Sequence, residues 1–401
     1  MRWIVSTDHG GPNHSKLDAE QRYPSLLQAR RAVPDVLQFY GIELDTPAAD
    51  HSSLIIPRVA TERDILFDLE RRFGARDPFP ADPSQNTEAK MVEALRVMRQ
   101  LPHKPVMFAN HPARSATGLG AYGLDTPEEF RNWNDTAPDV LTGFEGAPGH
   151  QAGALNNDGT IDPTGARGGY GSYPTMGGFD QMTARLGGLW NSLLGEGRRW
   201  WITSTSDSHV HYTEGGSDFW PGEYSKTYVH ATTDYADVLD ALRKGRIFVT
   251  LGDLIDRLDL TATAQPGNSV TVGETLRLNN KNRRDVEVEV RVRQPRGDNS
   301  AGDRPQVKRV DVITGQITGR VTDRSADTNS TTKVVGRYDA GDWKREGDWI
   351  VVKHTLRDVD GPMYVRVRGT NTDELEPLPD AHGSNPWEDL WFYSNPIFVE
   401  P

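Results

Sequence analysis

The chain has 401 residues, carries a net charge of −12 and contains no cysteine. Its length favours two domains over one. Because cysteine is absent, disulfide bonds and thiolate metal sites are excluded, and any metal ion must be held by His, Asp and Glu. The negative charge argues against a nucleic-acid-binding surface. No apolar run is long enough to span a bilayer, so we expect neither nucleic-acid nor membrane partners.

The first part of the chain, residues 1–257, alternates strand-like with helix-like segments. Period-two and buried apolar runs predict strands at 3–6, 37–42, 53–56, 106–109, 140–144, 200–203 and 227–231. Apolar residues at helical spacing predict helices at 23–33, 63–73, 88–100, 178–194 and 235–244. This alternation is typical of an α/β barrel or an open parallel sheet.

The second part, residues 258–401, has a different pattern. The runs DVEVEVRVRQ, WIVVKHTLRD and PMYVRVRG alternate apolar and polar residues, and polar Gly- and Asp-rich segments separate them. Such strands bury one face each, which predicts an antiparallel β-sandwich domain joined to the first part at 250–256.

Acidic and imidazole side chains follow the predicted strands of the first part. The C-terminal ends of strands form the active face of α/β barrels and doubly wound sheets, so these side chains should meet at one face. His51 comes eight residues after Glu43 and would reach the same face. The side chains that follow strand ends are Asp8, His9, Glu43, His111, Glu145, Asp207 and His209.

A single histidine after a strand is usually an ordinary polar residue that enters a loop. Five strands that all end in such residues favour a metal centre instead. His150 and His211 fit a ligand or substrate contact as well as they fit a solvated loop. The chain has no Gly-x-Ser-x-Gly motif, which argues against a serine hydrolase.

The motifs STDHG, GIE, NHP and SDSH, with His51 between the second and the third, resemble in this order the PHP (polymerase and histidinol phosphatase) superfamily. The segment TYVHATTDYADVLDALRKGRIFVTLGD resembles the part of PHP phosphoesterases that follows SDSH. WPGEYSKTYV and the closing FYSNPIFVE resemble the longer metallohydrolases grouped with carbaryl hydrolase. The resemblance covers nearly all of the first domain and the last strand of the second.

The resemblance implies a distorted (β/α)7 barrel that holds two or three divalent ions, Zn, Mn or Fe. A metal-bound hydroxide would attack a phosphorus or carbonyl centre. Arg114 would clamp a substrate anion, and Lys226 or His211 would share that duty or protonate the leaving group. His9 and His209 would bind one ion, and Glu43 would bridge two. The implied metal ligands are Asp8, His9, Glu43, His51, His111, Glu145, Asp207 and His209.

One family motif has no counterpart in this sequence. The superfamily opens with His-x-His on a first strand, whereas only one short strand precedes Asp8 and His9 here. The resemblance therefore implies an unpaired sheet edge and favours a further segment upstream; a truncated chain or a lost metal ion are the alternatives. MRWIVSTDHGG does not fit a signal peptide, and an export signal would have to lie upstream, so no location is predicted.

The leading functional hypothesis is a metal-dependent phosphoesterase with a small-molecule substrate. A second hypothesis places carboxylic or carbamate ester hydrolysis at the same metal site. A third is a non-catalytic binding or scaffold protein with a decayed site. The sequence predicts neither the substrate nor the oligomeric state.

Overall fold

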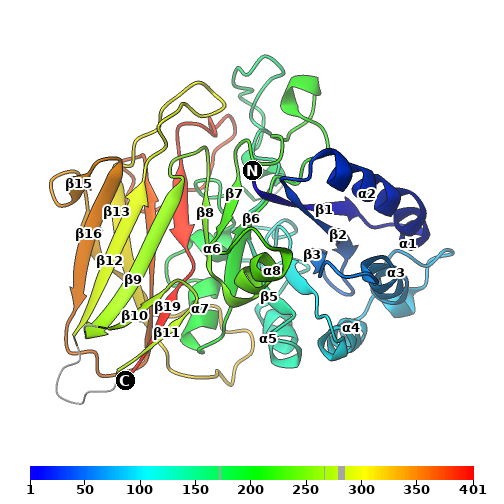
Figure 1. The fold of residues 1–401 in the computed structure, drawn as a ribbon, viewed down its shortest axis with the longest axis horizontal. Helices are drawn as coiled ribbons and strands as arrows, with labels where there is room; N and C mark the ends of the chain where they lie inside the picture. The colour runs from blue at the N-terminus through cyan, green and yellow to red at the C-terminus, as the bar shows by residue number, and fades with distance from the viewer. Residues whose placement is uncertain (171–172, 266, 279–284) are drawn as a thin grey trace.

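The computed structural model describes residues 1–170, 173–265, 267–278 and 285–401. An α/β part and a layer of antiparallel sheets pack side by side (Figure 1). Within the described ranges, no helix is both long and apolar enough to cross a membrane.

The α/β part is built on a six-stranded sheet that curls into a half-barrel. Its strands follow each other in chain order, with β1 and β6 as the two edges. Five strands run in the same direction, while β3 runs antiparallel to both of its neighbours. The strands are β1 (Trp3–His9), β2 (Leu37–Asp45), β3 (His51–Ile56), β4 (Val106–Ala109), β5 (Leu141–Ala147) and β6 (Trp201–Ser204).

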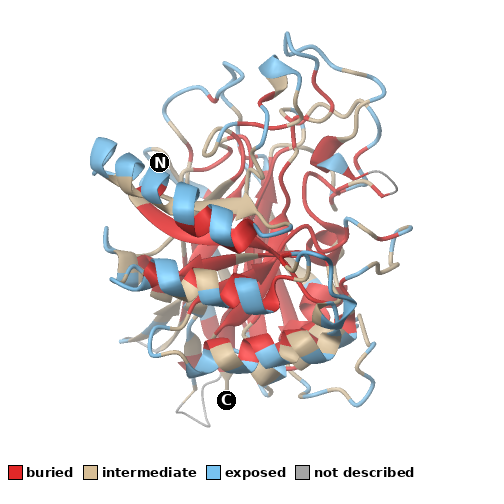
Figure 2. Ribbon diagram, turned by 90° about the vertical axis from the view of Figure 1, so that its right-hand side faces the viewer, coloured by how far each residue is buried: buried red, intermediate tan, exposed pale blue. Residues whose placement is uncertain are grey.

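Helices cover this sheet with their exposed faces outward, and strands β2 to β6 are largely buried, whereas β1 is half-buried (Figure 2). A π-helical turn, Asp18–Arg22, links the first two helices. Single 3₁₀ turns lie at Pro83–Gln85, Arg167–Gly169 and Tyr212–Glu214. The α-helices are α1 (His14–Leu17), α2 (Tyr23–Ala32), α3 (Glu62–Phe73), α4 (Glu88–Gln100), α5 (Pro127–Thr136), α6 (Gln181–Ala184), α7 (Leu189–Gly195) and α8 (Tyr235–Lys244).

The predicted helix at 178–194 is wrong. The segment instead forms two short helices, α6 and α7, and the chain between them passes through Gly187 at φ 75° and Gly188. A positive φ is accessible to glycine and breaks the helical path. The helices predicted at 88–100 and 235–244 are confirmed, and α5 had not been predicted.

Two further sheets form the second part. The five-stranded sheet contains β9 (Arg257–Gln265), β10 (Asn268–Thr271), β12 (Val286–Arg293), β15 (Lys344–Glu346) and β16 (Trp349–Leu356). The eight-stranded sheet contains β7 (Lys226–Val229), β8 (Ile247–Thr250), β11 (Thr275–Arg277), β13 (Arg309–Gln316), β14 (Lys333–Tyr338), β17 (Met363–Thr370), β18 (Trp391–Ser394) and β19 (Ile397–Glu400). Nearly all strand pairs in them are antiparallel; only β11 and β19 run parallel.

Side chains join the half-barrel to the eight-stranded sheet at the free edge of β6. The Asn395 amide accepts from the Ile202 N–H and donates to the Ile202 carbonyl, at 2.9 and 3.1 Å. The Thr227 hydroxyl does the same for Ser204. Because β8 pairs with the C-terminal strand β18 on one side and with β7 on the other, this sheet contains strands from both sides of residue 257. The division at that residue remains a prediction.

Candidate metal centre

The strand directions gather the predicted ligands at one edge of the half-barrel. His9 ends β1 and Glu43 lies near the end of β2, where it is the register partner of His9. Since β3 runs the opposite way, its first residue, His51, lies at the same edge. His111 and Asp207 follow β4 and β6, which run parallel to β1. One edge of the sheet therefore gathers side chains that lie as far apart in the sequence as His9 and Asp207.

Among the described residues, three groups of side chains bring potential ligand atoms within 4.8 Å of one another. Two of the groups share His51, whose ring lies 4.4 Å from that of His9 and 5.3 Å from that of His111, centroid to centroid. A shared imidazole between two groups is compatible with two neighbouring ions. The groups are His9, Asp45 and His51; Glu43, His51 and His111; and His150, Asp207 and His209.

Glu43 is the carboxylate at the middle of the second group. Its Oε1 lies 3.1 Å from His51 Nδ1 and 3.2 Å from His111 Nε2. Burial alone would raise the pKa of Glu43, but the two imidazoles hold the pKa well below its usual range. Burial lowers the pKa of His51, yet Asp45 and Glu43 together raise it to about 9. The Glu43 carboxylate is therefore ionised.

Glu145 lies beside this group in β5. Its carboxylate accepts from the backbone N–H of His111 at 2.6 Å and from the hydroxyl of Thr205. Burial raises the pKa of Glu145 to about 7, with His111 lowering it and the Asp207 carboxylate raising it further. A buried carboxyl with this pKa can be ionised by a nearby cation at neutral pH.

The third group is built on a loop after β6. His150 Nε2 lies 3.0 Å from Asp207 Oδ2, and its Nδ1 contacts Asp218 at 2.5 Å. Asp218 also accepts from the backbone N–H groups of His209 and Val210. Burial lowers the pKa of His150, but the two aspartates raise it to about 10. Asp218 thus fixes the His150 ring while the His209 ring remains about half exposed.

Three of these residues adopt a left-handed backbone that is uncommon outside glycine. Their φ angles are 31° at His111, 54° at His150 and 45° at Asp207. Such conformations cost free energy and concentrate at ligand sites, where the surrounding structure holds them in place. They redirect the chain at the ends of β4, β5 and β6 toward the shared edge.

The residues present fit a divalent cation. His111 Nδ1 and Asp45 Oδ2 are buried and have no hydrogen-bond partner in the described part of the chain. Buried polar atoms are normally satisfied, so these two atoms are available for a further partner. A Cβ atom at position 10 would lie only 2.8 Å from Asp45 Oδ2. Any residue larger than glycine would therefore push this oxygen from its observed position. A donor set of nitrogen and oxygen without sulfur suits Zn, Mn or Fe.

The structure does not bring Asp8 into any of the three groups. Successive side chains of a strand point to opposite faces, so Asp8 and His9 diverge. The Asp8 carboxylate lies 3.2 Å from His14 Nε2 and 3.1 Å from Arg22 Nη2. His14 also contacts Glu70 at 2.6 Å, which completes a largely buried polar network behind β1.

The three predicted catalytic side chains are all engaged in ion pairs. Arg114 donates to Asp50 through Nε and Nη2, and Lys226 pairs with Asp253. His211 Nε2 lies 2.9 Å from Glu223 Oε2, and its ring stacks on Trp220. Arg114 is near the first two groups through Asp50, whose Oδ1 lies 3.6 Å from His51 Nδ1.

Sequence reasoning missed Asp45, Arg76 and Asp218. Asp45 lies two residues after Glu43 on β2, so the period of a strand places both carboxylates on one face, a signal that was present. Arg76 donates to Asp45 Oδ1 through Nε at 2.7 Å. Neither Arg76 nor Asp218 has a local sequence signal, because only the fold brings them to the site.

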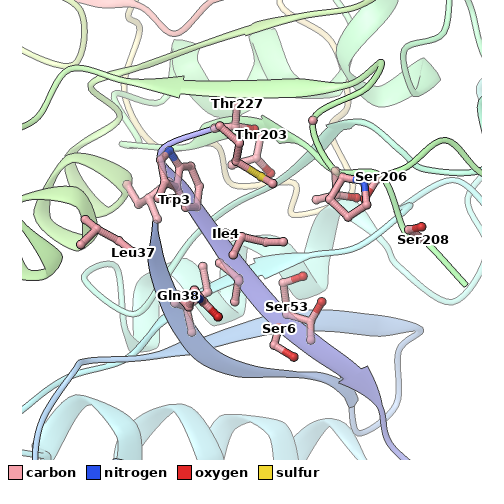
Figure 3. Close-up of a pocket in the computed structure, with 18 of the residues that line it drawn as sticks. Trp3, Ile4, Ser6, Leu37, Gln38, Ser53, Thr203, Ser206, Ser208 and Thr227 are labelled. Carbon is pink, nitrogen blue, oxygen red and sulfur yellow. The ribbon is translucent and has the colours of Figure 1, made fainter. Parts of the chain in front are cut away.

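A cavity of about 1020 Å³ opens between β1 and β7 (Figure 3). At one end it is lined by Glu43, Glu145, Asp207 and the edge residues His9 and His209. The rest of its wall mixes apolar side chains with hydroxyl and other polar groups (Figure 3). Apolar side chains there include Trp3, Ile4, Leu37, Ile55 and Phe108.

The chain was compared with protein-family models, curated proteins and solved structures, and none of them matches it.

Proposed function

We propose that the protein is a metal-dependent hydrolase of the PHP type that cleaves a phosphoester bond in a small-molecule substrate. The observation that carries the proposal is the pair of groups that share His51, in which the buried His111 Nδ1 and Asp45 Oδ2 have no hydrogen-bond partner in the described chain. The order of the motifs STDHG, GIE, NHP and SDSH supports the same family. The curled half-barrel corresponds to an open part of the barrel expected for that family.

The residues have separable duties in this proposal. His9, Asp45, Glu43, His51 and His111 would hold one or two ions, and His150, Asp207 and His209 a further one. Bound divalent ions would supply Lewis-acid activation of water and neutralise charge that develops on the phosphoryl group. Glu145 lies at the cavity wall and holds the His111 backbone in its left-handed conformation.

The His9 ring is oriented by its neighbour. Its Nδ1 donates to the carbonyl of Gly10 at 2.7 Å, which leaves the ring's lone pair on Nε2. Fixing the tautomer of a ligand histidine in this way is a common feature of metal sites. Asp218 does the same for His150, whose Nε2 then faces Asp207.

Hydrolysis of a carboxylic or carbamate ester at the same site is the second candidate function. The apolar part of the cavity wall favours it, because Trp3, Ile4 and Phe108 suit an uncharged apolar substrate better than a charged one. Parallel assays on a phosphate monoester and an aryl ester separate the two. Faster turnover of the aryl ester would replace the phosphoesterase proposal.

Replacing the shared ligand tests the proposal. His51→Ala should lower the rate of metal-dependent phosphoester hydrolysis by about 100-fold or more, because it removes a ligand from two groups at once. The matched control is His103→Ala at an exposed histidine, which should retain the parent rate. Hydrolysis that survives both a chelator and His51→Ala would rule out the metal mechanism.

A further inference from the structure

Arg76 places a guanidinium against the first metal-ligand group. It follows α3 and donates through Nε to Asp45 Oδ1, while its Nη2 lies 3.3 and 3.4 Å from the two ring nitrogens of His9. The Arg76 side chain is 54% exposed. A positive charge therefore stands at the solvent side of His9 and Asp45.

This guanidinium is only partly used by the protein. It has five N–H donors, and its Nη1 has no hydrogen-bond partner among the described residues. The two carboxylate oxygens of Asp45 have different surroundings. Oδ1 accepts a hydrogen bond from Arg76, whereas the buried Oδ2 has no hydrogen-bond partner in the described part of the chain. Asp45 can therefore bind a cation through Oδ2 and keep Arg76 in place through Oδ1.

Arg114 is held near His51 in a similar way, through the carboxylate of Asp50 instead of Asp45. His51 Nε2 lies 3.4 Å from Asp45 Oδ1, the oxygen that holds Arg76. His51 Nδ1 lies 3.6 Å from Asp50 Oδ1, the oxygen that holds Arg114. The Arg114 side chain is 42% exposed, and its Nη1 also has no partner among the described residues. Each guanidinium is thus one carboxylate oxygen away from the same imidazole.

We infer that Arg76 is a specificity-determining residue that, together with Arg114, selects a doubly charged phosphate monoester at the metal centre. This inference rests on the proposed phosphoesterase function. Guanidinium groups match the oxygens of phosphate in geometry and charge. A monoester presents three terminal oxygens and two charges to a guanidinium. A diester has fewer terminal oxygens and one charge, and a neutral ester has no charge.

The test measures binding of inorganic phosphate to Mn²⁺-loaded protein by calorimetry. Arg76→Gln should weaken phosphate binding about 10- to 100-fold, which is the usual loss for a charge-assisted hydrogen bond. Mn²⁺ affinity should be unchanged or tighter, because Asp45 loses a competing cation. Arg76→Lys keeps the charge without the planar fork and should show an intermediate loss. The matched control is Arg72→Gln, at an exposed arginine that pairs with Asp68 on α3.

Turnover gives a second readout. For Arg76→Gln, kcat/KM for 4-nitrophenyl phosphate should fall at least about tenfold more than kcat/KM for bis(4-nitrophenyl) phosphate. Arg76→Gln protein that binds both Mn²⁺ and phosphate like the parent would overturn the inference and leave the proposed function intact. Parent protein that binds no Mn²⁺ would overturn the proposed function, and the inference with it.

Discussion

At the scale of single residues, side-chain direction decides which predicted ligands meet. His9 and Glu43 are register partners on neighbouring parallel strands and face the same side. Asp8 faces the other side, where it belongs to a network with His14, Glu70 and Arg22. Strand period alone could have separated Asp8 from His9 and included Asp45 with Glu43. The strand period could not have identified Arg76, because the position of Arg76 depends on how the chain returns to the sheet after α3.

Asp18 gives a pH prediction at this scale. It is buried at the C-terminal end of α1 and accepts a hydrogen bond from Tyr40. Burial raises the pKa of Asp18 to about 6, although Tyr40 lowers it. The folded state therefore binds this proton more tightly than the unfolded state does. The stabilising contribution is complete below the ordinary aspartate pKa and is lost as pH rises through about 6.

Asp18→Asn removes this titration and keeps an oxygen for Tyr40. Relative to the parent, the variant should gain about 2 kcal/mol in free energy of unfolding between pH 4.5 and pH 7. Urea unfolding of both proteins at the two pH values measures the difference. An equal stability difference at both pH values would show that Asp18 titrates normally in the folded protein.

At the scale of elements, apolar patterns located most strands but not their directions. Segments 106–109 and 37–42 were placed within the observed β4 and β2. Alternation suggested a parallel sheet, yet β3 is antiparallel because a short turn, Thr46–Asp50, connects it directly to β2 without a helix. That reversal is what brings His51 to the site. The sequence signal for it was the short distance between Glu43 and His51.

The missed helix α5 has a clear start signal in the sequence. Thr126 accepts from the Glu129 N–H, and the Glu129 carboxylate accepts from the Thr126 N–H, with Pro127 at the first helical position. This capping box satisfies two backbone donors at the helix N-terminus. The helix then carries the buried Arg131, which pairs with Glu196 at 2.7 Å.

Thr126→Ala should lower the free energy of unfolding by about 1 kcal/mol, because it removes the cap. Thr136 ends the same helix and donates only to the carbonyl of Asn132, so Thr136→Ala is the matched control and should change stability by about 0.5 kcal/mol or less. Denaturant unfolding measures both variants. A cap variant no less stable than its control would mean that tertiary packing alone holds α5.

At the scale of the whole molecule, the half-barrel and the eight-stranded sheet form one continuous core. Trp201 of β6 packs edge-on against Phe398 of β19, and Asn395 completes the β6 edge. The sequence predicted two parts but not this junction, because the contacting residues are nearly 200 positions apart. β1 remains the other edge of the half-barrel, and the cavity lies between it and β7.

Metal content per chain tests the central claim most directly. Elemental analysis should be made on protein purified without chelator, in parallel with His51→Ala. The account predicts two or three equivalents of Zn, Mn or Fe in the parent, because two ligand groups share His51 and a third contains Asp207. The His51→Ala variant should hold fewer equivalents. A parent chain that holds no transition metal, even after incubation with Mn²⁺, would contradict the account.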